Sequence, residues 1–116
     1  MQVIINADHN LDLNEKSIRE LESDVEAKLA HFSSRLTRVE VHVTGESAGR
    51  ATGDDIRCQI EARPEGRAAE TASDQASSVD GAVAGALRKM QHVLETTFGR
   101  LDHRKGNTSM GGAESR

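Results

Sequence analysis

The sequence is nearly free of aromatic residues: it has no tryptophan, no tyrosine and only two phenylalanines, Phe32 and Phe98. Proteins that hold single-stranded nucleic acid commonly stack its bases on aromatic side chains. That mode of binding is therefore nearly excluded here. Any contact with nucleic acid would have to be made with its backbone and its shape.

The residues that crosslink a chain or hold a metal ion are also scarce. Cys58 is the single cysteine, so no internal disulfide can form, and the five histidines are scattered without the spacing of a zinc site. We therefore predict no metal site and no cofactor. Cys58 lies in phase with the apolar residues of a predicted strand, which favours a buried core thiol over a redox or nucleophilic one.

Sequence motifs of catalysis are missing as well. The chain contains no nucleophile elbow, no Walker loop, no dinucleotide-binding glycine pattern and no metal-binding helix motif. These absences predict a protein that is not an enzyme.

No run of about 18 apolar residues occurs, which excludes a membrane-spanning helix, and the first ten residues lack the layout of a signal peptide. We expect a cytoplasmic protein with no membrane partner. Its 116 residues suit one domain. We place that domain at residues 1–103 and expect the polar tail, 104–116, to be disordered.

Charge is distributed unevenly along the chain. The net charge is −4, and the first 34 residues alone carry −4, whereas residues 88–105 carry +3. A negative total argues against a nucleic-acid partner, but a local positive surface is what phosphates would meet. The distribution therefore leaves such a partner open.

Hydrophobic periodicity predicts six elements in the order β-α-β-β-β-α. They are a strand at 2–6, a helix running from a cap at Asp12 to Leu36, strands at 39–44, 56–63 and 67–73, and a helix from a cap at Ser77 to Leu101. Residues 45–55 form a glycine-containing connection and residues 63–66 a turn.

These elements predict an α+β fold, a two-layer sandwich in which a four-stranded mixed sheet carries two helices on one face. The first strand, helix and second strand form a crossover unit, so these two strands should pair in parallel. Phe32 should lie in the core. The Gly81 and Gly85 pair favours close packing of the second helix on the sheet over a membrane-type helix dimer.

Basic side chains recur at helical spacing on both predicted helices. The first stripe contains Lys28, His31 and Arg35, with Arg38 directly after it, and the second contains Arg88, Lys89, His92 and Arg100, extended by Arg104 and Lys105. The two stripes are either a phosphate-binding surface or merely solvated helix faces. Composition alone does not decide between these interpretations.

Several segments resemble the family of ribosome hibernation-promoting factors and ribosome-associated inhibitors, also called sigma-54 modulation proteins. The resemblance covers residues 1 to about 101 and depends on the order and spacing of four segments: 25–28 (VEAK), 35–42 (RLTRVEVH), 57–63 (RCQIEAR) and 79–88 (VDGAVAGALR). It implies a protein that occupies the decoding channel of the small ribosomal subunit and silences translation under stress, without catalysing a reaction.

We therefore expect the protein to bind ribosomal RNA phosphates through the basic flanks of its helices, without specificity for DNA. The leading contacts are Lys28, Arg35, Arg38, Arg88, Lys89 and Arg100, joined by His31, His92, Arg104 and Lys105. The alternative is a protein-interaction module of the same fold that has lost ribosome binding. Its acidic first helix, with Glu15, Glu22 and Glu26, would face a basic protein partner.

Overall fold

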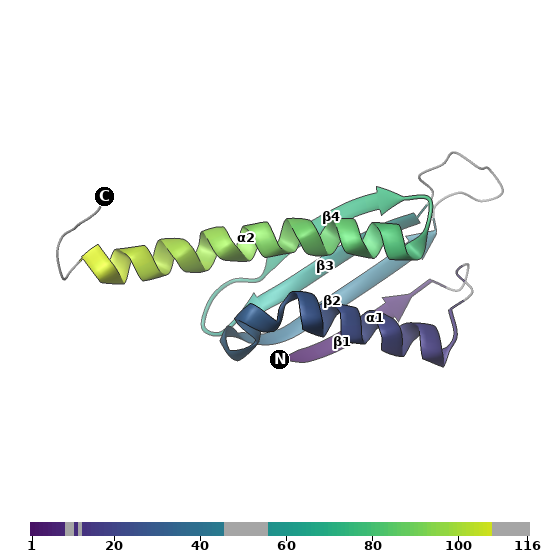
Figure 1. The fold of residues 1–116 in the computed structure, drawn as a ribbon, viewed down its shortest axis with the longest axis horizontal. Helices are drawn as coiled ribbons and strands as arrows, with labels where there is room; N and C mark the ends of the chain where they lie inside the picture. Colours follow the sequence, from purple (N-terminus) through teal and green to yellow (C-terminus); the bar gives the residue numbers. More distant parts are fainter. Residues whose placement is uncertain (9–10, 12, 46–55, 108–116) are drawn as a thin grey trace.

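The computed structural model describes residues 1–8, 11, 13–45 and 56–107, with side chains as far as residue 100. Four strands form one sheet in the order β1-β2-β3-β4, which is also their order in the sequence (Figure 1). They are β1 (Gln2–Ala7), β2 (Leu36–Gly45), β3 (Ile56–Pro64) and β4 (Glu70–Ala76). The β1–β2 pair is parallel and the other two pairs are antiparallel, which confirms the predicted mixed sheet.

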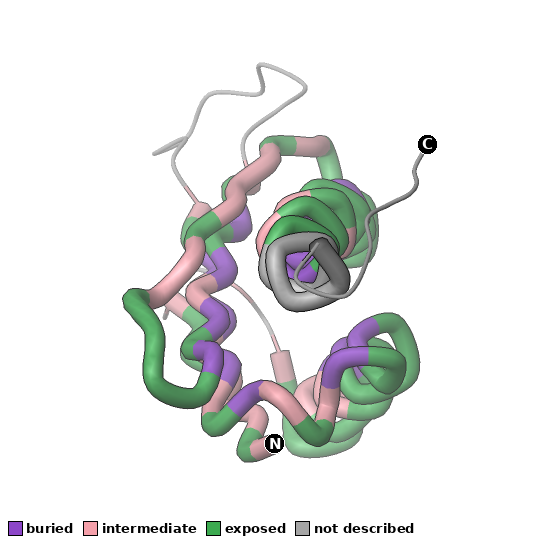
Figure 2. The backbone as a smooth tube through the Cα atoms, turned by 90° about the vertical axis from the view of Figure 1, so that its left-hand side faces the viewer, coloured by how far each residue is buried: buried purple, intermediate pink, exposed green. Residues whose placement is uncertain are grey.

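The helices are α1 (Glu15–Lys28), a short 3₁₀ helix η1 (Ala30–Arg35) and α2 (Val79–Asn107). Both α-helices lie on the same side of the sheet (Figure 2). α1 packs beside β1, and α2 lies across β4 and β3. The predicted α+β two-layer sandwich of order β-α-β-β-β-α is confirmed.

The core lies between the sheet and the helices because the strands alternate inward and outward residues. On β2 the valines at 39, 41 and 43 are buried, and on β3 the buried residues are Cys58, Ile60 and Ala62. α2 covers them with an apolar stripe of Val83, Leu87, Met90, Leu94 and Phe98. The opposite face of the sheet carries polar residues such as Arg38, Glu40 and His42, and no described helix covers it.

The first helix is shorter than predicted. α1 ends at Lys28, the chain continues as η1, and Leu36 begins β2. Leu29 and Phe32 are three residues apart, a spacing that keeps both inward in a 3₁₀ helix as well as in an α-helix. Periodicity alone therefore could not find this end. At the other end the cap is Asn14, whose side chain accepts a hydrogen bond from the Ser17 N–H at 2.8 Å, whereas Asp12 lies outside the described residues.

Boundaries of β4 and α2 also differ from the prediction. β4 begins at Glu70, three residues after the predicted Arg67, because the turn after Pro64 includes Gly66 at a φ of 73° and the first cross-strand pair joins Ala62 to Glu70. The cap of α2 is Ser78, one residue after the predicted Ser77, and its hydroxyl accepts from the Gly81 N–H at 3.0 Å. α2 ends at Asn107, six residues after the predicted Leu101, so residues 104–107 of the predicted tail belong to the helix. Residues 46–55 and 108–116 lie outside the described residues, so the predicted loop and the disorder of the remaining tail stay predictions.

α2 approaches β4 closely at Gly85, which confirms the predicted close packing of this glycine on the sheet. A Cβ added at Gly85 would overlap the Asp74 carboxylate and would lie 3.2 Å from the Asp74 Cβ. The carboxylate cannot simply turn away, since Asp74 is hydrogen-bonded to Lys89 and to the backbone of Gln75. Only a residue without a side chain allows this contact.

We expect Gly85→Ala to lower the free energy of unfolding by about 1–3 kcal/mol, the usual range for forcing extra atoms into a packed contact. Urea denaturation measures the effect. Gly99→Ala is the matched control in the same helix, since nothing lies within 4 Å of the added Cβ. There the gain in helix propensity should stabilise the protein by up to about 1 kcal/mol. Equal effects at both positions would contradict the close contact.

Candidate nucleic-acid interface

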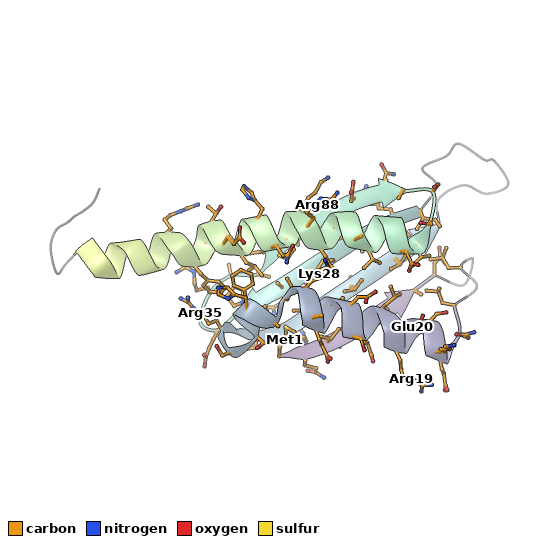
Figure 3. All side chains as sticks on the ribbon, viewed as in Figure 1. Met1, Arg19, Glu20, Lys28, Arg35 and Arg88 are labelled. Atoms are coloured by element: carbon orange, nitrogen blue, oxygen red, sulfur yellow. The ribbon has the colours of Figure 1, made fainter. Side chains whose placement is uncertain are left out.

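The first predicted stripe of basic residues is divided among three elements. Lys28 is the last residue of α1, His31 and Arg35 belong to η1, and Arg38 lies in β2. Lys28 is exposed and lies near the gap between the helices (Figure 3). Its backbone carbonyl accepts a hydrogen bond from the Gln91 side chain at 2.9 Å. This bond ties the end of α1 to the middle of α2.

Arg38 lies on the other side of the molecule. It shares the outward phase of β2 with Glu40 and His42, so its side chain is on the sheet face opposite the helices. Its Nε is 3.0 Å from the Glu40 carboxylate, and His42 Nε2 is 3.3 Å from the same carboxylate. The structure therefore does not bring Arg38 to one surface with Lys28 and Arg35.

The two phenylalanines join η1 to α2. Phe32 and Phe98 stack with ring centroids 5.7 Å apart, and His31 meets the Phe32 ring edge-on. The Arg35 guanidinium lies 4.1 Å from the centroid of Phe98. A guanidinium held over a ring face loses little freedom when it binds a phosphate. Both phenylalanines are buried, so neither ring is available to stack on a base.

The second predicted stripe is present on α2. Arg88, His92 and Arg100 are exposed, and none forms an ion pair within the part of the chain whose side chains are described. Arg88 lies on the side of α2 away from α1 (Figure 3). The side chains of Arg104 and Lys105 lie outside the described part.

Lys89 differs from its neighbours because it already has partners. Its Nζ is 3.3 Å from Asp74 Oδ1 and donates to the Ser73 carbonyl at 3.2 Å. Hydrogen bonds from the Gln75 backbone and from Lys89 hold the pKa of the Asp74 carboxyl below its ordinary value. Lys89 therefore anchors α2 to β4, at the turn that follows Gly85.

One basic residue near this helix was missed by the sequence analysis. Arg67, in the connection between β3 and β4, lines a groove of about 390 Å³ together with Glu70, His92, Val93, Thr96, Thr97 and Arg100. Arg67 belongs to no periodic stripe because it follows a turn. Only the packing of α2 on the hairpin brings it close to His92 and Arg100.

Cys58 is buried in β3 as predicted, with no exposed surface. Desolvation by burial, and next the negative charge of Asp74, raise the pKa of the thiol from 9.0 to about 12. At neutral pH the group is a protonated thiol inside the core and not a nucleophile.

We expect Cys58 of the folded protein to resist a thiol-alkylating reagent at pH 8 and to react fully in urea, as mass spectrometry would show. The raised pKa also predicts how the free energy of unfolding changes with pH. The contribution of the neutral thiol is fully present below pH 9 and is lost as the pH rises towards 12. Rapid labelling of the native protein would show that the strand opens more readily than its burial implies.

Among the residues with described positions, no three His, Cys, Asp or Glu side chains gather as they would around a metal ion. The described helices include none with the length and apolar character needed to cross a membrane.

Comparison with known proteins places the chain among ribosome-related sequences. A family model described as "Sigma 54 modulation protein / S30EA ribosomal protein" matches residues 4–102. None of the curated proteins matches the sequence.

Solved structures share the fold. One is a ribosomal subunit interface protein from Coxiella burnetii, with a TM-score of 0.64 at 13% identity, covering 85% of this chain and 99% of the other. Another is the N-terminal domain of Protein Y from Thermus thermophilus, with a TM-score of 0.64 at 14% identity, covering 84% and 99%. At such low identity this likeness concerns the fold alone.

Proposed function

Because the chain belongs to the sigma 54 modulation protein / S30EA ribosomal protein family, we propose that it associates with ribosomes by binding phosphates of ribosomal RNA. The observation that carries the proposal is the row of exposed basic residues on α2, Arg88, His92 and Arg100, which have no ion-pair partner within the described side chains. A cation without a protein partner is available to replace the counterions of a phosphate.

The positions of the basic residues support some members of the predicted set more than others. Lys28, His31 and Arg35 lie where the end of α1 meets α2, and together with the cations of α2 they form what we call the helix-side surface. Arg38 and Lys89 support it less, since the first is on the opposite sheet face and the second is held by Asp74. Arg104 and Lys105 continue the same helix and stay predicted contacts.

The net charge of −4 does not oppose this function. Surface charges separated by more than about 8 Å are largely screened at physiological salt. The acidic residues of α1 precede Lys28 along that helix, whereas Arg88, His92 and Arg100 follow one another along α2. Between residues 88 and 100, α2 carries Arg88, Lys89 and Arg100 against Glu95, so the charge of this stretch is positive.

The finer proposal is that the protein occupies the decoding channel of the small subunit and inhibits translation. The scarcity of exposed aromatic side chains supports recognition of folded RNA by backbone and shape. The proposal requires no catalysed reaction, and it places the protein in the cytoplasm, where ribosomes are.

Sedimentation through sucrose gradients tests ribosome association. The protein should travel with small subunits or whole ribosomes from stationary cells and should dissociate as salt rises, since each phosphate contact releases counterions. In a cell-free translation reaction, added protein should reduce synthesis, and excess initiator tRNA and mRNA should relieve the effect. Binding that is absent, or that does not change with salt, would overturn the RNA-phosphate proposal.

The alternative is a module that binds a basic protein through α1. One observation favours it: the helix has five acidic residues against three basic ones, and Glu15 and Glu26 are exposed. Charge reversal at this helix separates the two functions, as described in the Discussion.

A further inference from the structure

The groove between α2 and the β3–β4 hairpin has features that general RNA attraction does not require. Its walls come from two separate parts of the fold, the connection before β4 and the outer flank of α2. A volume of about 390 Å³ lies within the range of small-molecule sites, about 300–1,000 Å³. A ligand of nucleotide size would fill it.

Three cationic or potentially cationic side chains line the groove. Arg67 faces it from the hairpin, while His92 and Arg100 are eight residues apart on α2, a distance of roughly 12 Å along the helix. None of the three forms an ion pair within the part of the chain whose side chains are described. Two arginines on opposite walls are suited to bidentate recognition of phosphate oxygens.

The remaining polar groups restrict which ligand fits. Among the residues with described side chains, Glu70 is the one acid of the lining, and its carboxylate accepts a hydrogen bond from the Thr97 hydroxyl at 2.9 Å. The two arginines therefore exceed the acidic charge by one even with His92 neutral. The Thr96 hydroxyl lies between His92 and Arg100 along the helix and adds a donor for a phosphate or ribose oxygen.

Of the described side chains that line the groove, His92 is the one aromatic group and Val93 the one aliphatic residue. A purine or pyrimidine base would find little surface on which to stack. Recognition should therefore depend on the phosphate and not on the identity of the base.

We propose that this groove is a specific binding site for a phosphate group, held by Arg67 and Arg100 from opposite walls. The phosphate belongs either to a free nucleotide or to an RNA strand. The site goes beyond the proposed ribosome association, because its chemistry is complete in the protein without a ribosome.

The test is a titration of ¹⁵N-labelled protein followed by NMR, with ADP, CDP, adenosine and a hexanucleotide RNA as separate probes. ADP and CDP should shift the amide signals of Arg67, His92 and Arg100, with dissociation constants within about twofold of each other. Adenosine, which lacks a phosphate, should cause no shift. The hexanucleotide distinguishes the sources: if it binds here and the nucleotides do not, the ligand is an RNA phosphate.

Substitution provides the control. Arg67→Gln and Arg100→Gln should each weaken binding by about tenfold or more, whereas Arg57→Gln, an exposed arginine on the opposite sheet face, should not change it. Arg67 and Arg100 are exposed, so the variants should fold. Shifts that lie elsewhere, equal binding of adenosine, or affinity unchanged by Arg67→Gln would overturn the proposal.

Sedimentation of the same variants separates this proposal from the previous one. Loss of nucleotide binding in Arg67→Gln with intact ribosome association would show that ribosome association does not depend on Arg67, although His92 and Arg100 belong to both surfaces. If the wild-type protein binds nucleotides but never sediments with ribosomes, the phosphate site in the groove stands and the proposed ribosome association is rejected.

Discussion

Phe32→Ala should lower the free energy of unfolding by about 3–5 kcal/mol, the range found when a buried phenylalanine is removed from a core. The ring is 5% exposed and stacks on Phe98, so its loss leaves a cavity between η1 and α2. Domains of this size have only about 5–15 kcal/mol of stability in total. A variant with a much lower urea midpoint, or one that fails to fold, is the expected result.

The control is Glu95→Ala. Glu95 lines a surface pocket together with Phe32 and Phe98 but is exposed, so its removal should change stability by no more than about 0.5 kcal/mol. A double-mutant cycle with Phe98→Ala should give a coupling of about 0.5–1.5 kcal/mol beyond the lost burial. A loss below about 1 kcal/mol in Phe32→Ala would mean that η1 does not hold this ring in the core.

The second large effect concerns ribosome association. Lys28→Glu combined with Arg88→Glu should abolish co-sedimentation at physiological salt, because both side chains are exposed on the helix-side surface. Each lost phosphate contact lowers the slope of log affinity against log salt by about one unit. For the residual binding at low salt, the slope of log affinity against log salt should therefore be smaller by about two units.

The matched control has the same change in net charge on the other face. Arg57→Glu combined with Arg63→Glu reverses two arginines of β3 that lie on the face opposite the helices. This variant should retain most of its ribosome association. If both double variants lose binding equally, net charge and not the helix-side surface controls the interaction.

Charge reversal on α1 tests the alternative function. Glu15→Lys combined with Glu22→Lys should leave ribosome association unchanged or strengthen it through long-range attraction. If the protein instead binds a basic protein partner, the opposite is expected. The Glu15→Lys/Glu22→Lys variant would lose that partner, and the Lys28→Glu/Arg88→Glu variant would keep it. That outcome would leave the fold assignment intact and reject the function.

Local sequence determined the order of the elements and the faces they bury. The alternation at residues 39–43 predicted a strand with inward valines, and the spacing of Val83, Leu87, Met90 and Leu94 predicted the buried stripe of α2. Both patterns are local, because a period of 2 or 3.6 residues is a property of the element itself. The same alternation also contained the information that Arg38 points away from the helices, although adjacency to Arg35 in the chain suggested otherwise.

Tertiary structure decided where elements end and which charges are available. The change from α1 to η1 after Lys28 preserves the inward spacing of apolar residues, so periodicity does not reveal it. Whether Lys89 is paired depends on Asp74, which is 15 residues earlier in the sequence and meets it only because Gly85 allows α2 to approach β4. Arg67 and Arg100 line one groove for a similar reason: they are brought to it by the packing of a helix on a hairpin, and no local pattern encodes that arrangement.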